Sequence, residues 1–240
     1  MKKKIKKIDV EGHNTLNVIE KADKFNEWMF DSISPFCKGE ILEIGSGIGN
    51  ISKFFVNKKR QIILSDLRDN YCEILKEKFN NPVLKINLTH PDFDKKYATL
   101  FETFDTLFAL NVIEHIEDDN LAIANCKKLL KNDGVLIILV PAYQWLFGNF
   151  DKELEHFRRY SYKSLKNIIV KNKLEVQKLF FFNVIGIFGW LVSGKILRKK
   201  TIPAGQMNLF NLLVPVFKLA DKITFSKIGL SVICISIKRD

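Results

Sequence analysis

Short apolar segments alternate with amphipathic segments along the first 140 residues, and this alternation is the strongest constraint on the fold. The apolar segments of this region and two more near the C-terminus predict seven strands, at residues 40–44, 61–66, 82–87, 104–110, 134–140, 174–182 and 228–238. Helical periodicity predicts helices at residues 14–36, 51–56, 71–79, 118–131 and 161–171. Strands joined by helical crossovers indicate an α/β fold, with a doubly wound, mostly parallel sheet covered by helices on both faces.

Residues 183–226 depart from this pattern, because the segment is rich in Phe, Leu, Val and Lys. It predicts two helices separated by a basic turn at 195–200 and by the sequence Pro203-Ala204-Gly205. We therefore expect one domain over residues 1–240, in which a core at 14–182 is followed by a helical insertion and by a last strand within 227–240.

The insertion has two interpretations. It is either a lid over the active site or a basic, apolar face turned toward a membrane or a lipid-linked substrate. The longest apolar stretch, 179–192, is broken by Asn183, Gly186 and Gly189, and it is shorter than the roughly 20 residues of a membrane-spanning helix. These breaks favour the internal lid.

A glycine-rich loop follows the first predicted strand and opens the next helix. Gly45, Gly47 and Gly49 permit a sharp turn and let a ligand approach the backbone closely. A dinucleotide site would have its third glycine one position later, so this spacing disfavours a nicotinamide-dependent oxidoreductase. Asp66 ends the second predicted strand and can accept hydrogen bonds from both hydroxyls of a ribose. Loop and acid together predict an adenosine-containing ligand.

Residues 14–182, with Asn111-Val112-Ile113-Glu114-His115-Ile116 after the fourth strand, resemble the class I S-adenosylmethionine-dependent methyltransferases, which have a seven-stranded Rossmann-like sheet. The resemblance implies that Glu43 to Gly49 surrounds the methionine part of S-adenosylmethionine and that Asp66 holds its ribose. Asn87 stands by the adenine, where the family often has Asp, and Phe25 stands where relatives often have Tyr. The residues implied to bind S-adenosylmethionine, or the product S-adenosylhomocysteine, are Glu43, Gly45, Ser46, Gly47, Gly49, Asn50, Asp66, Leu67, Asn87, Leu88, Asn111 and Val112.

The loop after the fifth strand carries His156-Phe157-Arg158-Arg159-Tyr160, which resembles a bacterial subgroup of these methyltransferases. Some members of the subgroup accompany glycosyltransferases in cell-surface polysaccharide or lipid-linked sugar pathways. The resemblance therefore implies O-methylation of a small or lipid-linked, anionic metabolite, such as a sugar or a glycan precursor.

His115 and His156 are candidate bases, because a side chain with an ordinary pKa of about 6.5 can take a proton from a hydroxyl group. Arginines can grip a phosphate or carboxylate as forked donors, although we expect one of the two in the motif to pair with a nearby acid such as Asp151. We therefore predict catalytic roles for His115, His156 and Tyr160, acceptor contacts for Tyr143, Arg158 and Arg159, and no metal.

The formal net charge of +11 bears on the partners. The lysine-rich start, residues 1–7, could seek phosphates, but lysines occur throughout the sequence, which favours a solvated arm. No RNA-binding module is visible, so RNA methylation is the alternative function and nucleic acid is not an expected partner. A non-catalytic subunit that binds the cofactor is the third candidate.

The cysteines and the N-terminal residues bear on the location of the protein. The four cysteines have neither metal-site nor disulfide spacing, and no apolar signal segment follows the lysine-rich start. We therefore expect a cytoplasmic protein, with peripheral membrane contact through 183–226 as the alternative.

Overall fold

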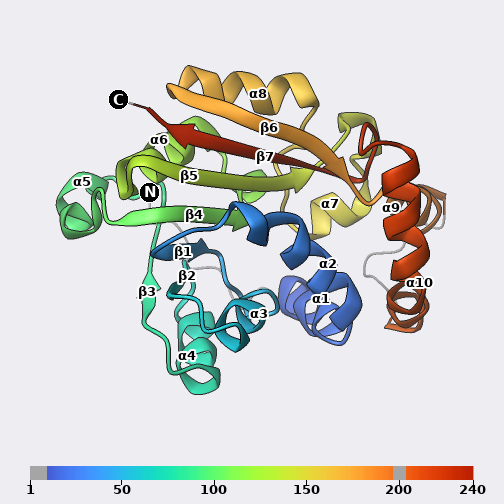
Figure 1. Cartoon of the computed structure of the whole chain (residues 1–240). Coiled ribbons are helices and arrows are strands. Elements are labelled where there is room, and N and C mark those ends of the chain that lie inside the picture. Colours follow the sequence, from blue (N-terminus) through green and yellow to red (C-terminus); the bar gives the residue numbers. More distant parts are fainter. Residues whose placement is uncertain (1–9, 197–203, 240) are drawn as a thin grey trace, which may run out of the picture.

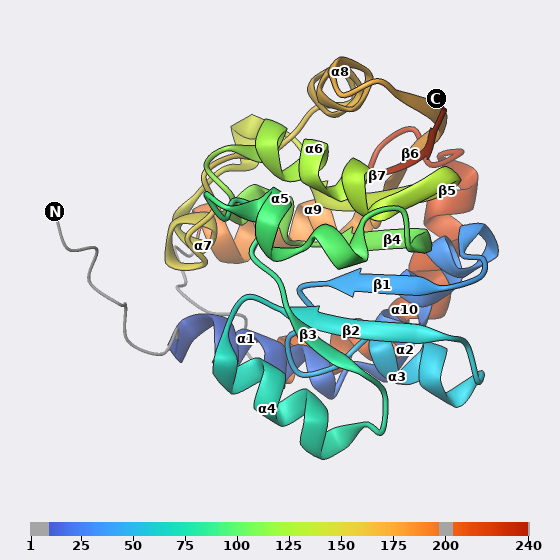
Figure 2. The same ribbon diagram turned by 90° about the vertical axis from the view of Figure 1, so that its left-hand side faces the viewer.

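A computed structural model describes residues 10–196 and 204–239 and shows a twisted sheet between layers of helices (Figures 1 and 2). The sheet has seven strands in the order β3-β2-β1-β4-β5-β7-β6. Their bounds are β1 Ile41–Ile44, β2 Ile62–Asp66, β3 Val83–Lys85, β4 Phe104–Leu110, β5 Leu130–Pro141, β6 Leu174–Phe182 and β7 Ser231–Lys238. Strands β1 to β5 pair in parallel, and β7 runs antiparallel between β5 and β6. The predicted doubly wound, mostly parallel fold is confirmed.

Ten α-helices lie within the described residues. Their bounds are α1 Val10–Glu20, α2 Asp23–Ile33, α3 Ser52–Asn57, α4 Asp69–Lys78, α5 Phe93–Lys96, α6 Asp119–Leu129, α7 Asn149–Glu153, α8 Tyr162–Lys171, α9 Val184–Trp190 and α10 Ala204–Ile223. A π-helix, Leu191–Ile196, follows α9. The turn predicted at 195–200 falls largely outside the described residues, as do the lysines of residues 1–7.

The single helix predicted over 14–36 is wrong, because the chain turns between α1 and α2. The amide of Asn26 donates to the carbonyl of Ile19 at 2.8 Å, which satisfies a carbonyl at the end of α1. Ala22 is buried at this turn with φ −94° and ψ 62°, outside the helical region. A 3-10 helix, Ser34–Phe36, continues α2. The apolar spacing carries no sign of the turn, because it continues through both helices.

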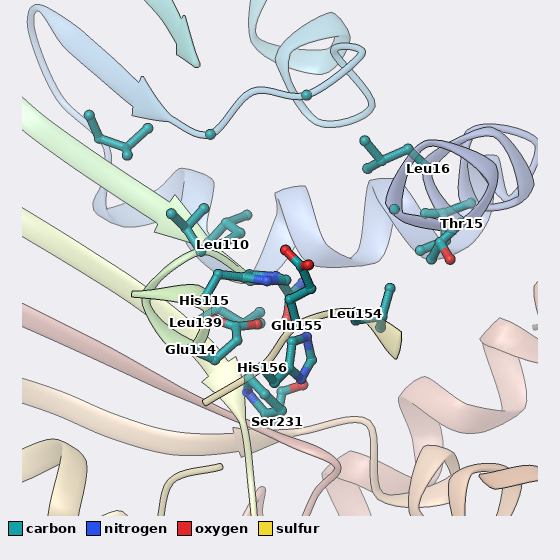
Figure 3. A pocket seen from close by; sticks show the side chains of 18 of the residues that line it. Thr15, Leu16, Leu110, Glu114, His115, Leu139, Leu154, Glu155, His156 and Ser231 are labelled. Atoms are coloured by element: carbon teal, nitrogen blue, oxygen red, sulfur yellow. The ribbon is translucent and has the colours of Figure 1, made fainter. Parts of the chain in front are cut away.

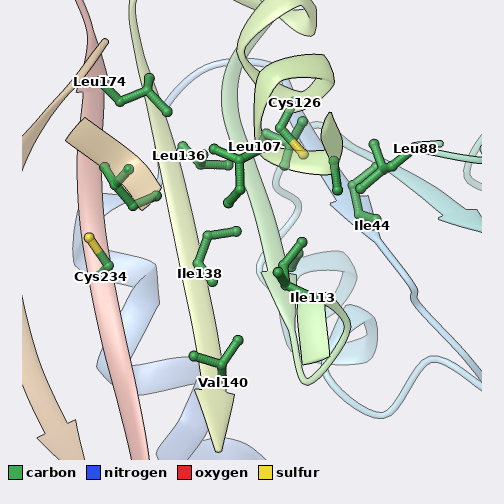
Figure 4. Close-up of a cluster of buried hydrophobic side chains, with 14 of the residues drawn as sticks. Ile44, Leu88, Leu107, Ile113, Cys126, Leu136, Ile138, Val140, Leu174 and Cys234 are labelled. Carbon is green, nitrogen blue, oxygen red and sulfur yellow. The ribbon is translucent and has the colours of Figure 1, made fainter. Parts of the chain in front are cut away.

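Two apolar cores fill the two sides of the sheet. Neighbouring residues of a strand point to opposite faces of the sheet. Ile138 of β5 therefore lies in the core under α5, α6 and α8 (Figure 4). Ile137 lies in the other core, under α2, α3 and α10. Both residues are fully buried. Burial on both faces is the physical reason why the central strands appear as continuous apolar runs in the sequence.

A carboxylate of the insertion binds the junction between β6 and α9. Asp221 of α10 accepts hydrogen bonds from the backbone amides of Asn183 and Val184, each at 2.7 Å, where β6 passes into α9. The inner side of α10 buries Val214 and Phe217 in the second core. Its outer side exposes an apolar row formed by Leu209, Leu212, Val216, Leu219 and Ile223. Within the described residues, no helix has the length and apolarity needed to cross a membrane.

Candidate functional site

A single large cavity lies beyond the carboxyl ends of β1 and β4. The two strands are neighbours, but the chain leads from them toward opposite edges of the sheet, and such a switch point is where α/β sheets bind ligands. The cavity measures about 1290 Å³ and is lined by strand ends and loops, by α1 and by the inner sides of α9 and α10 (Figure 3). This exceeds the roughly 300–1,000 Å³ of a typical small-molecule site, so the cavity has room for two ligands.

The glycine loop forms one wall of the cavity. Gly45 has φ +72°, and a Cβ atom on it would lie 2.5 Å from Val112 Cγ2. Ser46 ties the loop to β2, since its amide donates to the carbonyl of Ser65 at 2.8 Å and its hydroxyl accepts from the amide of Ser65 at 3.1 Å. Only glycine combines this conformation with so close an approach of two loops.

Asp66 stands where the sequence places it, at the end of β2 and in the cavity wall. Its Oδ2 accepts from the amide of Gly47 at 3.0 Å, and its Oδ1 accepts from the amide of Arg68 at 2.9 Å. Burial raises the pKa of this carboxyl, against the opposing effect of these two hydrogen bonds. The carboxylate is therefore held in one orientation at the mouth of the glycine loop.

Two buried amide oxygens bear on whether S-adenosylmethionine fits this site. Asn26 and Asn50 line the cavity, and each has an Oδ1 atom that is buried without a hydrogen-bond partner among the described residues. Their amide nitrogens donate to the carbonyls of Ile19 and Leu16 in α1, at 2.8 and 3.1 Å, so the oxygens remain as acceptors. An ammonium group is a suitable donor for them. With Asp66 as a ribose acceptor, the residues fit the amino-acid and ribose parts of the cofactor.

Nearly all the residues predicted to bind the cofactor line this cavity: Glu43, Gly45, Ser46, Gly47, Asn50, Asp66, Leu67, Asn87, Leu88, Asn111 and Val112. Their contacts with the cofactor stay predictions. Gly49 does not line it, and its importance is conformational, since it has φ +86° and a Cβ would lie 2.3 Å from Phe79 Cε2. The Oδ1 of Asn87 accepts from the amide of Thr89 at 3.0 Å, so its amide nitrogen is the group left to meet an adenine edge.

Glu43 lines the same wall and is 4% exposed. Its carboxyl accepts a hydrogen bond from the hydroxyl of Ser52. Burial raises the pKa of Glu43 to about 7, although the hydrogen bonds from Ser52 and Ser46 oppose the rise. Near neutral pH this carboxyl is therefore partly protonated in the folded chain.

Glu43 makes the stability of the ligand-free chain depend on pH. The folded-state pKa of about 7 lies above the ordinary value of 4.5, so between these values the folded chain keeps a proton that the unfolded chain has lost. We expect this carboxyl to lower the free energy of unfolding by roughly 3 kcal/mol as the pH rises through that window, at 1.36 kcal/mol per pKa unit. Urea unfolding at pH 5 and pH 8 measures the change. The Glu43→Gln variant should lack the part of this change that comes from the carboxyl group. If its free energy of unfolding depends on pH as in the unaltered chain, Glu43 is not the group responsible.

A second cluster of polar side chains lies in the cavity beyond the end of β4 (Figure 3). Glu114 and His115 belong to the 3-10 helix Ile113–His115, and His156 comes from the loop after α7. The two imidazole rings meet edge to face, with centroids 4.6 Å apart. Glu114 is fully buried, neither of its carboxyl oxygens has a hydrogen-bond partner among the described residues, and burial raises its pKa to about 8. The structure thus brings together the two predicted bases and adds an acid that sequence reasoning did not select.

His156 is held by Asp151, which is fully buried in the middle of the short helix α7. Asp151 Oδ1 lies 3.0 Å from His156 Nδ1 and 2.7 Å from Arg159 Nε, and its Oδ2 accepts from the amide of Gly148 at 2.9 Å. Burial acts to raise the pKa of Asp151, but the hydrogen bond from His156 and the charge of Arg159 outweigh it, so the net shift is downward. The ionised carboxylate therefore accepts from Nδ1–H, which leaves the lone pair on Nε2 of the ring.

The backbone of Phe157 and the side chains of Arg158 and Tyr160 join two loops. The amide of Phe157 donates to the carbonyl of Glu114 at 2.8 Å. Arg158 donates to the carbonyl of Glu117 and pairs with Asp119, each at 2.7 Å. The hydroxyl of Tyr160 donates to the same Asp119 carboxylate at 2.7 Å. These contacts explain how residues from distant parts of the chain form one cluster.

Three residues predicted to act in catalysis or acceptor binding lie outside the cavity lining. Arg158, Tyr160 and Tyr143 do not line the cavity. Arg158 and Tyr160 hold Asp119, and Tyr143 stacks on Phe181 with ring centroids 5.4 Å apart. Their predicted roles in catalysis or acceptor binding have no support from this placement, because their polar groups serve the packing of loops.

Arg159 does line the cavity, but its guanidinium is buried and pairs with Asp151. This agrees with the expectation that one of the two arginines would pair with a nearby acid. The expected grip of the two arginines on an anionic acceptor therefore has no support, since Arg158 lies outside the cavity lining and Arg159 pairs with Asp151.

Comparison with known proteins matches the part of the chain that carries the glycine loop and Asp66. Residues 42–136 match a family model described as a methyltransferase domain. The ubiquinone biosynthesis O-methyltransferase of Bartonella quintana is 28% identical over 166 residues, covering 60% of this chain and 64% of that protein. An uncharacterized methyltransferase of Staphylococcus carnosus is 30% identical over 116 residues, covering 48% of this chain and 54% of that protein. The chain thus spans less than two thirds of the length of these relatives.

Solved structures share the whole fold at low sequence identity. A SAM-dependent methyltransferase from Archaeoglobus fulgidus superposes with a TM-score of 0.58 at 15% identity, over 89% of this chain and 94% of that one. A SAM-dependent methyltransferase from Thermotoga maritima, described as a possible histamine N-methyltransferase, superposes with a TM-score of 0.61 at 17% identity, over 95% of this chain and 97% of that one. These likenesses establish the fold.

Proposed function

The chain has the class I S-adenosylmethionine-dependent methyltransferase fold around a methyltransferase domain, and from this premise we propose that it transfers a methyl group from S-adenosylmethionine to a hydroxyl oxygen of a small or lipid-linked acceptor. One observation carries the proposal: a single cavity has the glycine loop and Asp66 at one end and the Glu114–His115–His156 cluster beside it. The first set suits a methyl donor, and the second suits removal of a proton.

The cofactor supplies a methyl group that is activated by the positive charge on its sulfur atom. Asp66 is placed to accept from the ribose hydroxyls, and the unpartnered oxygens of Asn26 and Asn50 are placed to accept from the ammonium group. Gly45 and Gly47 let the loop turn without side chains that would fill the space. These groups position the donor, and positioning is a large part of what this reaction requires.

The cluster at the end of β4 acts on the acceptor. A hydroxyl group is a weak nucleophile until its proton is removed, so the enzyme must hold the hydroxyl and accept that proton. In the transfer, an electron pair of the acceptor oxygen forms the new O–C bond, the pair of the C–S bond returns to sulfur, and the hydroxyl proton leaves through the cluster to water. The chemistry therefore balances with no further reactant.

The cavity wall opposite the glycine loop favours an apolar acceptor. It is formed in large part by Phe150, Phe182, Trp190, Met207 and Phe210. Their aromatic and thioether side chains suit a ring or an alkyl chain. The curated relatives named as O-methyltransferases support oxygen as the methylated atom. An acceptor that carries a phenolic hydroxyl on an apolar body fits these groups better than the anionic sugar expected from the sequence.

Replacing Asp66 with alanine tests the donor half. The variant should bind S-adenosylhomocysteine more weakly by roughly 1–3 kcal/mol, which corresponds to about 5- to 150-fold, because the hydrogen bonds of the ribose are lost. Isothermal titration calorimetry measures the affinity. Asp69→Ala is the matched control, because Asp69 is an exposed carboxylate in α4 that pairs with Lys85. Absence of binding to the unaltered chain at millimolar ligand would overturn the cofactor assignment.

Transfer itself is tested with methyl-labelled S-adenosylmethionine and a panel of phenols and catechols with alkyl tails of increasing length. Label in the phenol fraction, increasing with tail length, supports the proposal. Label in added RNA alone would favour the RNA methyltransferase. Cofactor binding without transfer to any hydroxyl compound would favour the non-catalytic subunit.

A further inference from the structure

The carboxyl group of Glu114 is buried in the cavity wall without a compensating contact among the described residues. Its side chain is fully buried, it lines the cavity, and neither carboxyl oxygen has a hydrogen-bond partner among the described residues. Buried carboxyl oxygens without hydrogen-bond partners are costly, and a ligand in the cavity could satisfy them. The side chains beside Glu114 indicate which ligand this would be, because both are imidazoles, those of His115 and His156.

Glu114, His115 and His156 together form a set of metal ligands. One ligand atom from each lies within 4.8 Å of the others. Zinc in a tetrahedral site forms bonds of about 2.0–2.2 Å, which places its ligand atoms about 3.4 Å apart. Movements on the order of 1 Å would close the set, and His115 is an exposed residue of the cavity lining. We propose that these three residues bind a divalent transition-metal ion of the zinc class in the acceptor half of the cavity.

Asp151 provides a second, independent argument. A metal-binding histidine usually donates its other ring N–H to a carboxylate, which orients the ring and fixes the tautomer. Asp151 Oδ1 lies 3.0 Å from His156 Nδ1, and Arg159 and the amide of Gly148 hold that carboxylate in place. Nε2 of His156 is thereby kept as a lone-pair donor on the cavity side. This is the orientation that a metal site needs.

Two histidines and one carboxylate leave at least one coordination position open. In catalytic zinc sites the open position takes water or the substrate, and the ion lowers the pKa of the bound hydroxyl. Here the open position faces the cavity, so the acceptor hydroxyl would bind the ion, lose its proton to water and then take the methyl group. This role rests on the proposed function, whereas binding of the ion does not.

The proposal is tested by adding Co²⁺ and Zn²⁺ to the untagged full chain after treatment with a chelator. One Co²⁺ per chain is expected, with visible d–d absorption that Zn²⁺ removes by competition. Glu114→Gln and His156→Ala should each weaken binding by at least 10-fold. His90→Gln should not, because His90 lies outside the cavity lining and accepts from the amide of Asp92.

The affinity for S-adenosylhomocysteine is measured on the same samples. It tests the proposed methyltransferase function independently of the metal site, and it shows that each variant is folded. A chain that binds S-adenosylhomocysteine but neither ion at millimolar concentration would overturn the metal site and leave the methyltransferase proposal standing. Binding that is unchanged in both Glu114→Gln and His156→Ala would also overturn it, since the ion would then occupy another place.

Discussion

Replacing His156 with alanine is expected to lower the turnover number by about 10²–10⁴-fold, the usual contribution of a positioned proton-transfer group, while S-adenosylhomocysteine affinity stays nearly unchanged. Turnover and affinity are expected to respond differently because the two groups of residues lie in different parts of the cavity. His156 lies in the Glu114–His115–His156 cluster, whereas the cofactor half of the cavity is formed by the glycine loop, by Asp66 and by residues of α1 and α2. The loss is expected whether the imidazole takes the proton itself or holds an ion that acidifies the hydroxyl.

Turnover is measured with labelled S-adenosylmethionine and the best acceptor of the phenol panel, and affinity is measured by calorimetry. His90→Ala is the matched control, since it removes an imidazole outside the cavity lining. If His156→Ala abolishes cofactor binding while the fold remains intact, the role assigned to His156 is wrong.

Replacing Asp151 with asparagine is expected to destabilise the chain by about 3–5 kcal/mol, which is the usual cost of leaving one partner of a buried ion pair without the other. The side chains of Asp151 and Arg159 are both 0% exposed, and their atoms lie 2.7 Å apart. The guanidinium keeps its charge in the variant, and an amide of the same shape cannot neutralise it. The same substitution removes the carboxylate that orients His156, so turnover should fall as well.

Urea unfolding gives the change in the free energy of unfolding. Asp94→Asn is the matched control, because it breaks an ion pair with Lys128 at the surface, where the Asp side chain is 67% exposed. Surface pairs contribute about 0–1 kcal/mol, so the control should change little. Equal, small effects of the two substitutions would show that Asp151 and Arg159 do not form the buried pair described here.

Residue patterns along the chain predict the sheet and the position of the glycine loop and Asp66 at the ends of its strands. Buried parallel strands are continuous apolar runs, and the glycine loop and Asp66 lie at strand ends, where short-range rules apply. The helix predicted over 14–36 failed because its apolar spacing continues across a turn, and that turn depends on the buried Ala22 and on a side-chain bond from Asn26 to Ile19.

The acceptor half was predictable only in part. The sequence predicted roles for His115 and His156, but it also predicted acceptor contacts for Tyr143 and Arg158 and a catalytic role for Tyr160. In the structure these three hold loops together or stack outside the cavity lining. A polar motif in a loop does not show which of its side chains turn inward, because that depends on contacts with a distant segment, here residues 114–119.

The sequence by itself determined the doubly wound fold and the glycine loop with Asp66, because strand periodicity and backbone conformation at glycine are local properties. Only the tertiary structure decided what faces the acceptor. Glu114 is buried beside two imidazoles with no hydrogen-bond partner among the described residues, and Arg159 is paired with Asp151. Glu114 meets His156 because segments about 40 residues apart pack together, and Arg159 meets Asp151, 8 residues before it, because the loop folds back on α7. Burial and charge pairing of this kind are set by the folded arrangement.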